Sequence, residues 1–130
     1  MASPTIAIIE DDLGLIQMLE LLLAEEGYRV ITCTNGQKAH AVIRQTLPDI
    51  ILLDLRLETP DAGGMVLGLL ELDPMTQQIP VIVCSADTQA LRRWSLLLQE
   101  RKYTVLEKPV QPVLLLETIS EVLSRSKARA

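Results

Sequence analysis

Six polar side chains stand at or just after the ends of short apolar runs in the sequence. They are four carboxylates, one hydroxyl and one ammonium: Glu10, Asp11, Asp12, Asp54, Ser85 and Lys108. Two carboxylates about 5 Å apart repel by roughly 3 kcal/mol at an effective dielectric constant of about 20, so a cluster of them requires a cation. Oxygen ligands at a partly open site favour Mg²⁺, which binds one or two carboxylates and keeps several waters. The residue types therefore predict a magnesium site if the chain brings these runs together.

The apolar runs have the length of strands, and longer amphipathic segments separate them. The predicted strands are Ile6–Ile9, Tyr28–Cys33, Ile50–Leu53, Ile79–Cys84 and Tyr103–Leu106. The predicted helices are Leu13–Glu26, Gln37–Gln45, Gly63–Leu72, a fourth through Leu91 and Leu98, and a fifth that begins near Pro112. Asp12 and either Thr34 or Asn35 are the expected N-caps of the first two helices. Because parallel strands need right-handed crossovers, this alternation predicts an α/β sandwich around a parallel sheet, with ligands beyond the carboxyl ends of its strands.

The composition limits the class of protein. With 130 residues, 48% of them hydrophobic, the chain can form one domain with its own core. A net charge of −5 argues against a nucleic-acid surface, and no apolar run approaches the roughly 20 residues of a membrane span. The N-terminus has no cationic stretch, which favours a cytoplasmic protein. Cys33 and Cys84 are too few for a metal or disulfide framework, so both are expected to be reduced core residues.

Five motifs carry the polar residues and follow one another along the whole chain. They are Ile8-Ile9-Glu10-Asp11-Asp12, Asn35-Gly36-Gln37-Lys38-Ala39, Pro48-Asp49-Ile50-Ile51-Leu52-Leu53-Asp54, Ile79-Pro80-Val81-Ile82-Val83-Cys84-Ser85-Ala86 and Glu107-Lys108-Pro109. In this order and at these separations they resemble the receiver domains of two-component response regulators. The resemblance implies a flavodoxin-like fold with parallel strands in the order 2-1-3-4-5. It takes residues 1–124 as the receiver domain and leaves residues 125–130 as a basic tail, either a fraying helix end or the stub of a linker.

The resemblance also implies a role for each acidic residue. Asp54 is the implied nucleophile, which takes a phosphoryl group from a phosphohistidine on a sensor histidine kinase or a histidine phosphotransfer protein. Asp11 and Asp54 are implied to bind Mg²⁺ directly, together with the backbone carbonyl of Arg56, while Glu10 acts through water. Such a protein catalyses its own phosphorylation and dephosphorylation and is not a conventional enzyme.

Two further residues complete the implied site. Lys108, aimed by a cis bond to Pro109, neutralises charge on the phosphoryl oxygens during transfer. Ser85 donates its hydroxyl to a phosphoryl oxygen afterwards and draws its loop inward. The resemblance further implies that phosphorylation changes a surface around the fourth helix, the fifth strand and the fifth helix, where a second copy or an output domain binds.

Aromatic residues are scarce, and the usual switching ring of the family is missing. Val105 stands where the family usually carries Tyr or Phe, and Tyr103, on the same side of the strand, substitutes imperfectly or not at all. Trp94, the sole tryptophan, either packs in the core or lies on a partner surface formed with Tyr103, Val105 and the fifth helix. Both alternatives stay open on the sequence alone.

The loop after Asp54 reaches its first proline two residues later than is usual in the family. This loop borders the predicted pocket, so we expect altered access for water or a partner. Arg56 in the loop is expected to stack over the phosphate or to pair with Glu58 or Asp87. His40, the sole histidine, is expected to be a partly buried packing residue.

Other functions fit the sequence less well. A phosphohydrolase of the haloacid dehalogenase type needs D-x-D-x-[TV] after its first strand, which Glu10-Asp11-Asp12-Leu13-Gly14 does not supply. A P-loop nucleotide binder needs G-x-x-x-x-G-K-[ST], which does not occur. A receiver-like interaction module that is never phosphorylated stays open, because the switching aromatic is missing although the charged residues are kept.

Overall fold

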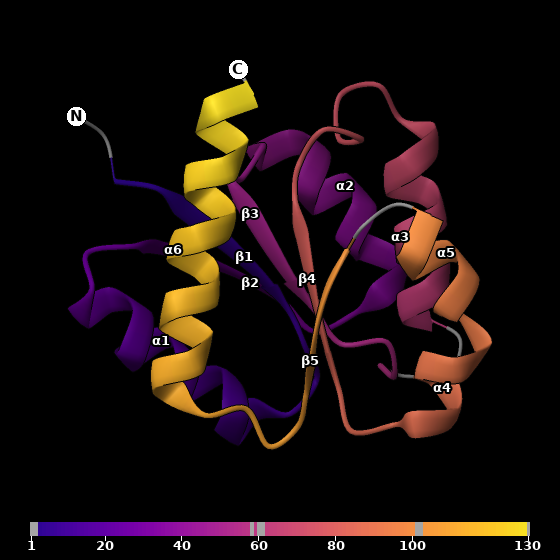
Figure 1. The fold of residues 1–130 in the computed structure, drawn as a ribbon, viewed down its shortest axis with the longest axis horizontal. Helices are drawn as coiled ribbons and strands as arrows, with labels where there is room; N and C mark the ends of the chain where they lie inside the picture. Colours follow the sequence, from indigo (N-terminus) through magenta and orange to yellow (C-terminus); the bar gives the residue numbers. More distant parts are fainter. Residues whose placement is uncertain (1–2, 58, 60–61, 101–102, 130) are drawn as a thin grey trace.

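A parallel sheet of five strands lies at the centre of the molecule (Figure 1). The computed structural model describes residues 3–57, 59, 62–100 and 103–129. The strands are β1 (Thr5–Ile9), β2 (Arg29–Cys33), β3 (Ile50–Leu53), β4 (Val81–Ser85) and β5 (Thr104–Glu107). Neighbouring strands are parallel and follow the order β2-β1-β3-β4-β5. The predicted fold class and strand order are therefore confirmed.

Helices cover both faces of this sheet. They are α1 (Leu13–Glu25), α2 (Gly36–Thr46), α3 (Ala62–Leu72), α4 (Thr88–Arg93), α5 (Ser95–Glu100) and α6 (Pro112–Arg129). Helices α1 and α6 lie on one face, whereas α2, α3, α4 and α5 lie on the other (Figure 1). Among the residues that the structure describes, no helix is both long and apolar enough to cross a membrane.

Two apolar cores follow from the alternation of side chains along the central strands. On β1, Ile6 and Ile8 face the layer of α1 and α6, whereas Ala7 and Ile9 face the opposite layer. All four are at most 1% exposed, because a strand covered on both faces has no solvent side. Burying each isoleucine contributes about 1.5–3 kcal/mol to folding. The residues just beyond such strands are therefore held by a densely packed sheet.

The first two helices begin at residues whose side chains favour helix starts. Asp12 is the N-cap of α1, and its Oδ1 accepts a hydrogen bond from the Leu15 N–H at 3.1 Å. Asn35 caps α2 in the same way through the Gln37 N–H at 2.7 Å. After α1, Gly27 has a φ of +86°, a left-handed conformation that glycine adopts without strain. The predicted caps are confirmed, and the Asp12 carboxylate serves the start of α1.

The fourth predicted helix is broken, so that prediction was wrong in this respect. The expected single helix through Leu91 and Leu98 forms instead as α4 and α5, with Trp94 between them. The ring of Trp94 packs directly on Gly64 of α3, a contact between distant parts of the chain that local periodicity cannot report. The last helix, α6, continues to Arg129, so the described part of the basic tail is helical, as one of its two alternatives implied.

Candidate functional site

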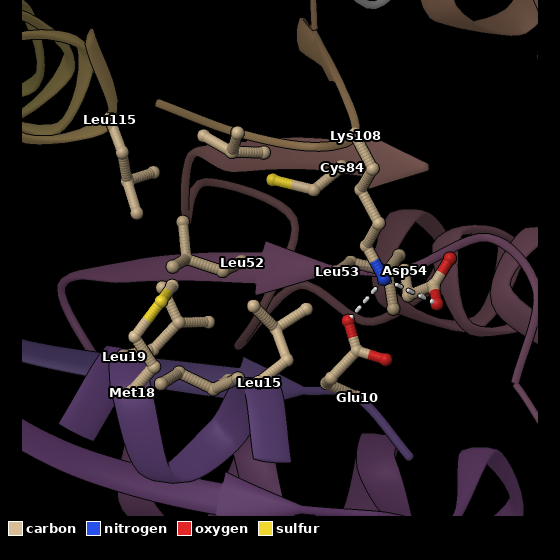
Figure 2. A pocket seen from close by; sticks show the side chains of 12 residues that line it. Glu10, Leu15, Met18, Leu19, Leu52, Leu53, Asp54, Cys84, Lys108 and Leu115 are labelled. Carbon is tan, nitrogen blue, oxygen red and sulfur yellow. Dashed lines mark hydrogen bonds and ion pairs between the residues drawn. The ribbon is translucent and has the colours of Figure 1, made fainter. Parts of the chain in front are cut away.

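Three charged side chains meet beyond the carboxyl ends of β1, β3 and β5 (Figure 2). The ammonium of Lys108 donates to Glu10 Oε1 at 2.6 Å and to Asp54 Oδ2 at 3.1 Å. The exposed fractions of the Lys108, Glu10 and Asp54 side chains are only 18%, 5% and 9%. Because water screens them weakly, these ion pairs are stronger than exposed ones. The fold thus joins residues that are 98 and 54 positions apart in sequence.

Backbone hydrogen bonds fix the position of Asp54. Its N–H donates to the carbonyl of Ile9 at 3.0 Å, which ties the end of β3 to the end of β1. Its Oδ1 accepts the N–H of Arg56 at 3.0 Å, while its Oδ2 faces Lys108. Both carboxylate oxygens are therefore oriented by donors of this chain.

Glu10, Asp11 and Asp54 form an acidic group, in which one oxygen of each residue lies within 4.8 Å of the others. Glu10 is buried and its Oε2 accepts the N–H groups of Asp11 and Asp12 at 3.2 and 3.3 Å. Asp11 is exposed, so the group is open on one side. A single ammonium leaves the three carboxylates with an excess of negative charge. An open set of oxygen ligands with this charge fits Mg²⁺.

The environment of Lys108 keeps it charged. Burial by itself lowers the pKa of the ammonium, but the hydrogen bond to Glu10 and the negative charges of Asp54 and Glu10 raise it more. The net effect is a pKa above the usual value for lysine. Lys108 is therefore a permanent positive charge beside Asp54 at neutral pH.

Ser85 ends β4 next to the site and is completely buried. Its Oγ accepts the N–H of Asp87 at 3.1 Å, and its carbonyl accepts the N–H of Lys108 at 3.1 Å. The Lys108–Pro109 bond is cis, as the resemblance implied. The backbone of the predicted hydroxyl donor is thus tied to that of the predicted cation.

Gly63 allows α3 to approach the backbone that carries Asp54. A Cβ on Gly63 would lie 2.3 Å from Leu55 Cα and 2.5 Å from the Asp54 carbonyl oxygen. The Gly63 N–H also donates to the Leu55 carbonyl at 3.0 Å. The sequence predicts Gly63 only as the first residue of a helix and does not predict this contact. The signal was the Gly63-Gly64 pair, which is unusual in the first turn of a helix because glycine weakens helices.

Arg56 and Asp87 approach each other from the loops after β3 and β4. The distance from Arg56 Nη1 to Asp87 Oδ2 is 3.8 Å, and the Arg56 side chain is 64% exposed. Of the alternatives open for Arg56, the structure shows the pair with Asp87, whereas Glu58 lies outside the described residues. Such an exposed pair contributes little stability. The pair is notable for its position, because it joins the two loops of the site that follow β3 and β4.

An apolar pocket lies beside the charged group on the side of α1. Leu15, Met18, Leu52, Cys84 and the stem of Lys108 are among its lining residues (Figure 2). Burial raises the pKa of the Cys84 thiol to about 12; Lys108 opposes this shift, whereas the charges of Asp54 and Glu10 add to it. Cys33 and Cys84 are both free cysteines, as predicted. The Cys84 thiol is therefore protonated and poorly reactive at neutral pH.

Tyr103 lies away from the charged group. The Tyr103 hydroxyl donates to Glu71 near the end of α3. Ser85 is level with Glu107 in the sheet, so four strand positions, about 13 Å, separate the levels of Tyr103 and Ser85. This distance favours the alternative in which Tyr103 does not replace the missing ring. Val105 is 40% exposed, and Trp94 packs against the apolar core, one of its two alternatives.

Comparison with known proteins points to one family. The family model of the response regulator receiver domain matches residues 6–120. The protein PilH of Pseudomonas aeruginosa is 32% identical over 121 residues, which are 92% of this chain and 97% of PilH. The phosphate regulon transcriptional regulatory protein PhoB of the same species is 38% identical over 87 residues, which are 66% of this chain and 37% of PhoB.

Solved structures share the fold. The crystal structure of a response regulator from Desulfuromonas acetoxidans matches with a TM-score of 0.77 at 27% identity, covering 92% of this chain and 96% of that chain. The receiver domain of the sensor histidine kinase PA1611 from Pseudomonas aeruginosa, which has a magnesium ion coordinated in its active site cleft, matches with a TM-score of 0.83 at 24% identity, covering 95% of this chain and 99% of that chain. The chain spans 37% of PhoB and 26% of the Escherichia coli protein GlrR. Since the family model matches nearly the whole chain, the protein belongs to the receiver domains of two-component response regulators.

Proposed function

We propose that Asp54 of this receiver domain accepts a phosphoryl group from a phosphohistidine in a Mg²⁺-dependent reaction. The observation that carries the proposal is the pair of donors that orient its carboxylate, the Arg56 N–H on Oδ1 and the Lys108 ammonium on Oδ2. Phosphoryl transfer depends mainly on positioning and on neutralising charge. An oriented carboxylate next to a buried cation supplies both.

The transfer forms one bond and breaks one. A carboxylate oxygen of Asp54 donates an electron pair to phosphorus, the P–N bond of the phosphohistidine breaks, and that electron pair returns to the imidazole of the partner. Lys108 exchanges its contacts with Asp54 and Glu10 for a phosphoryl oxygen, which stabilises the charge there. Ser85 releases the Asp87 N–H and donates its hydroxyl to another phosphoryl oxygen. Attack of water on phosphorus later breaks the bond between phosphorus and the Asp54 oxygen, which releases inorganic phosphate and restores the Asp54 carboxylate.

The proposed ligands of Mg²⁺ are Asp11, Asp54 and the backbone carbonyl of Arg56, with Glu10 acting through a bound water. The acidic group within 4.8 Å supports this assignment, as does the magnesium ion in the cleft of the PA1611 receiver domain. Bound Mg²⁺ supplies charge stabilisation for the phosphoryl oxygens. The side chains of this chain would hold the ion and orient Asp54, while Lys108 and Ser85 would donate to the phosphoryl oxygens.

The proposed donors of the phosphoryl group are a sensor histidine kinase or a histidine phosphotransfer protein. The proposed response is binding of a second copy or of an output domain around α4, β5 and α6. Relatives support both a single receiver and a longer regulator, since this chain spans 97% of PilH but 37% of PhoB. Residues 1–124 as the receiver unit, residues 125–130 as a basic tail or linker stub and a cytoplasmic location stay predictions.

Intact mass measured after incubation with Mg²⁺ and acetyl phosphate tests the proposal. The wild-type chain is expected to gain one phosphoryl group, and Asp54→Asn is expected to gain none. Asp49→Asn is a matched control, because Asp49 stands at the opposite end of β3, where its carboxylate accepts the Thr5 N–H at 2.7 Å. It should be phosphorylated like the wild type. Phosphorylation of Asp54→Asn at the wild-type rate, or in EDTA, contradicts the proposal.

A second candidate is an interaction module that is never phosphorylated. Val105 in place of an aromatic ring favours it, and so does the hydrogen bond that holds Tyr103 on Glu71. This function predicts that the wild-type chain gains no phosphoryl group from acetyl phosphate or phosphorylated kinases and does not respond to beryllofluoride. Partner binding by such a module would be the same for the wild type and Asp54→Asn.

A further inference from the structure

Two consecutive glycines in the first turn of α3 contact two different parts of the molecule. A Cβ on Gly63 would lie 2.3 Å from Leu55 Cα and 2.5 Å from the Asp54 carbonyl oxygen. A Cβ on Gly64 would lie 2.0 Å from both Cε2 and Cζ2 of Trp94. The same helical turn therefore touches the backbone of the proposed phosphoacceptor and the sole tryptophan of the chain.

Trp94 forms the junction between α4 and α5. Its carbonyl accepts the N–H of Leu98 in α5 at 3.0 Å, and its ring packs against the core together with Leu91 of α4. Its Nε1 is buried and, within the described part of the chain, has no hydrogen-bond partner. An unpartnered buried donor costs free energy, so an arrangement in which Nε1 reaches water competes with this packing. Leu96, two residues further on in α5, is 76% exposed.

The other end of α4 is connected to Ser85. The Ser85 Oγ accepts the Asp87 N–H at 3.1 Å, and the Asp87 carbonyl accepts the N–H of Leu91 at 3.1 Å. Helix α4 is only six residues long, so a displacement of Asp87 reaches Trp94 through about two helical turns. Trp94 is therefore contacted from two sides, by α3 and by α4.

We propose that Trp94 is the switching aromatic residue of this receiver domain. The inference rests on the proposed function, because phosphorylation of Asp54 is the event that moves both of its contacts. A change in the Asp54 backbone acts through the glycine pair of α3, while movement of Ser85 toward the phosphoryl group acts through α4. The indole ring leaves Gly64, its Nε1 reaches water, and the turn between α4 and α5 presents Leu96 in a new position.

In this proposal Trp94 has the role of the switching aromatic residue, which Val105 cannot have because it carries no ring. In the resembled family the switching ring belongs to the fifth strand, whereas here the ring belongs to the junction of two short helices. The surface that changes is accordingly the α4–α5 junction. An exposed apolar side chain of this junction is Leu96, preceded in sequence by the exposed Arg92 and Arg93.

Tryptophan emission tests the proposal directly, since Trp94 is the only tryptophan. Emission and iodide quenching are measured in Mg²⁺ with and without beryllofluoride, and intact mass is measured in parallel after acetyl phosphate. In the wild type, emission is expected to shift to longer wavelength and the quenching constant to rise roughly twofold, as a population shift toward an exposed ring requires. Asp54→Asn is expected to show neither change.

A pair of glycine variants on one helix provides the matched control. Gly64→Ala places its methyl group where the Trp94 ring lies, whereas a Cβ on Gly68 meets nothing within 4 Å. Gly64→Ala is expected to show the displaced emission before phosphorylation and to change little with beryllofluoride, although it still gains a phosphoryl group. Gly68→Ala is expected to respond like the wild type.

The outcomes separate the switch from the proposed function. A wild-type chain that gains a phosphoryl group while its emission and quenching stay constant overturns the switch and leaves the proposed function intact. A wild-type chain that gains none overturns both. If Gly64→Ala does not fold, amide hydrogen exchange of the wild type decides: faster exchange across α4 and α5 with beryllofluoride supports the switch, and unchanged exchange there overturns it.

Discussion

At the scale of single residues, Lys108 is what allows a buried group of carboxylates to exist. Its ammonium contacts Glu10 and Asp54, and its pKa is raised above the usual value by these two partners in spite of burial. A raised pKa means that the folded state holds the proton more tightly than the unfolded state. The resulting stability is fully present below the unfolded pKa of lysine and is lost as pH rises through the folded pKa.

Replacing Lys108 with methionine should destabilise the fold, because the acidic group then has no positive charge beside it. Met keeps an apolar stem, but Glu10 and Asp54 lose their counter-ion. The unfolding free energy is expected to fall by about 1–3 kcal/mol in EDTA, with part of the loss recovered in Mg²⁺. Urea unfolding in the two buffers measures both effects. Lys38→Met, at an exposed position of α2, serves as the control; equal stability of Lys108→Met and wild type in EDTA would show that this ion cluster does not stabilise the fold.

The Cys84 thiol should be almost inert in the folded protein. With its pKa raised to about 12 by burial, only about one thiol in ten thousand is ionised at a pH of about 8, against roughly a quarter for an unfolded cysteine. In a Cys33→Ser background, alkylation by iodoacetamide is expected to be at least roughly 100-fold slower in the folded than in the urea-unfolded chain. Equal rates would show that the Cys84 side chain is accessible and ionised.

At the scale of elements, the sequence predicts the strands and helix caps that depend on residues close to one another in the chain. The strands and the caps of α1 and α2 were predicted because apolar alternation and residues such as Asp12 act within one turn or strand. The residues at the strand ends were predicted to converge, and Glu10, Asp54 and Lys108 do so, because parallel strands place their carboxyl ends at one edge. The break at Trp94 was missed; the ring there packs on Gly64 of another helix, a contact that local periodicity does not reveal.

Glycine variants in α3 distinguish two effects on stability: the close approach of Gly63 to the backbone of Asp54 and Leu55, and the low helix propensity of glycine. Gly63→Ala is expected to lower the unfolding free energy by about 1–3 kcal/mol, because its Cβ would overlap with backbone atoms that cannot move aside cheaply. Gly68→Ala, with open space around the new methyl group, is expected to be neutral or to raise it by about 0.5–1 kcal/mol. Urea unfolding of both variants measures the difference. A Gly63→Ala chain as stable as Gly68→Ala would contradict the close approach.

At the scale of the whole molecule, a second ionic contact ties α2 to the segment after α3. His40 Nε2 lies 2.8 Å from Asp73 Oδ2, and Arg44 Nη1 lies 3.7 Å from the same oxygen. Asp73 Oδ1 accepts the Met75 N–H at 2.9 Å. His40 is partly buried, as predicted from the sequence. This contact shares no residue with the ion pairs of Lys108.

The Asp73 contact predicts how global stability depends on acid. The Met75 N–H lowers the pKa of Asp73, burial opposes this, and His40 and Arg44 lower it further, to a net value below 3.8. A lowered carboxyl pKa gives stability that is present above 3.8 and is lost as pH falls through the folded pKa. Asp73→Asn should therefore reduce Tm most at neutral pH, with the difference from wild type shrinking in acid. A difference independent of pH would show that the carboxylate charge is not involved.

The Lys108–Glu10 contact also has a consequence for biosynthesis. The amine and the carboxylate that it joins are 98 positions apart, so during translation the acidic cluster exists for a long interval without its counter-ion. Contacts between such distant positions form late and slow the folding of a domain. A ribosome-bound fragment that ends before β5 should therefore gain no phosphoryl group from acetyl phosphate. The ability to be phosphorylated should appear only once the last strand has left the exit tunnel.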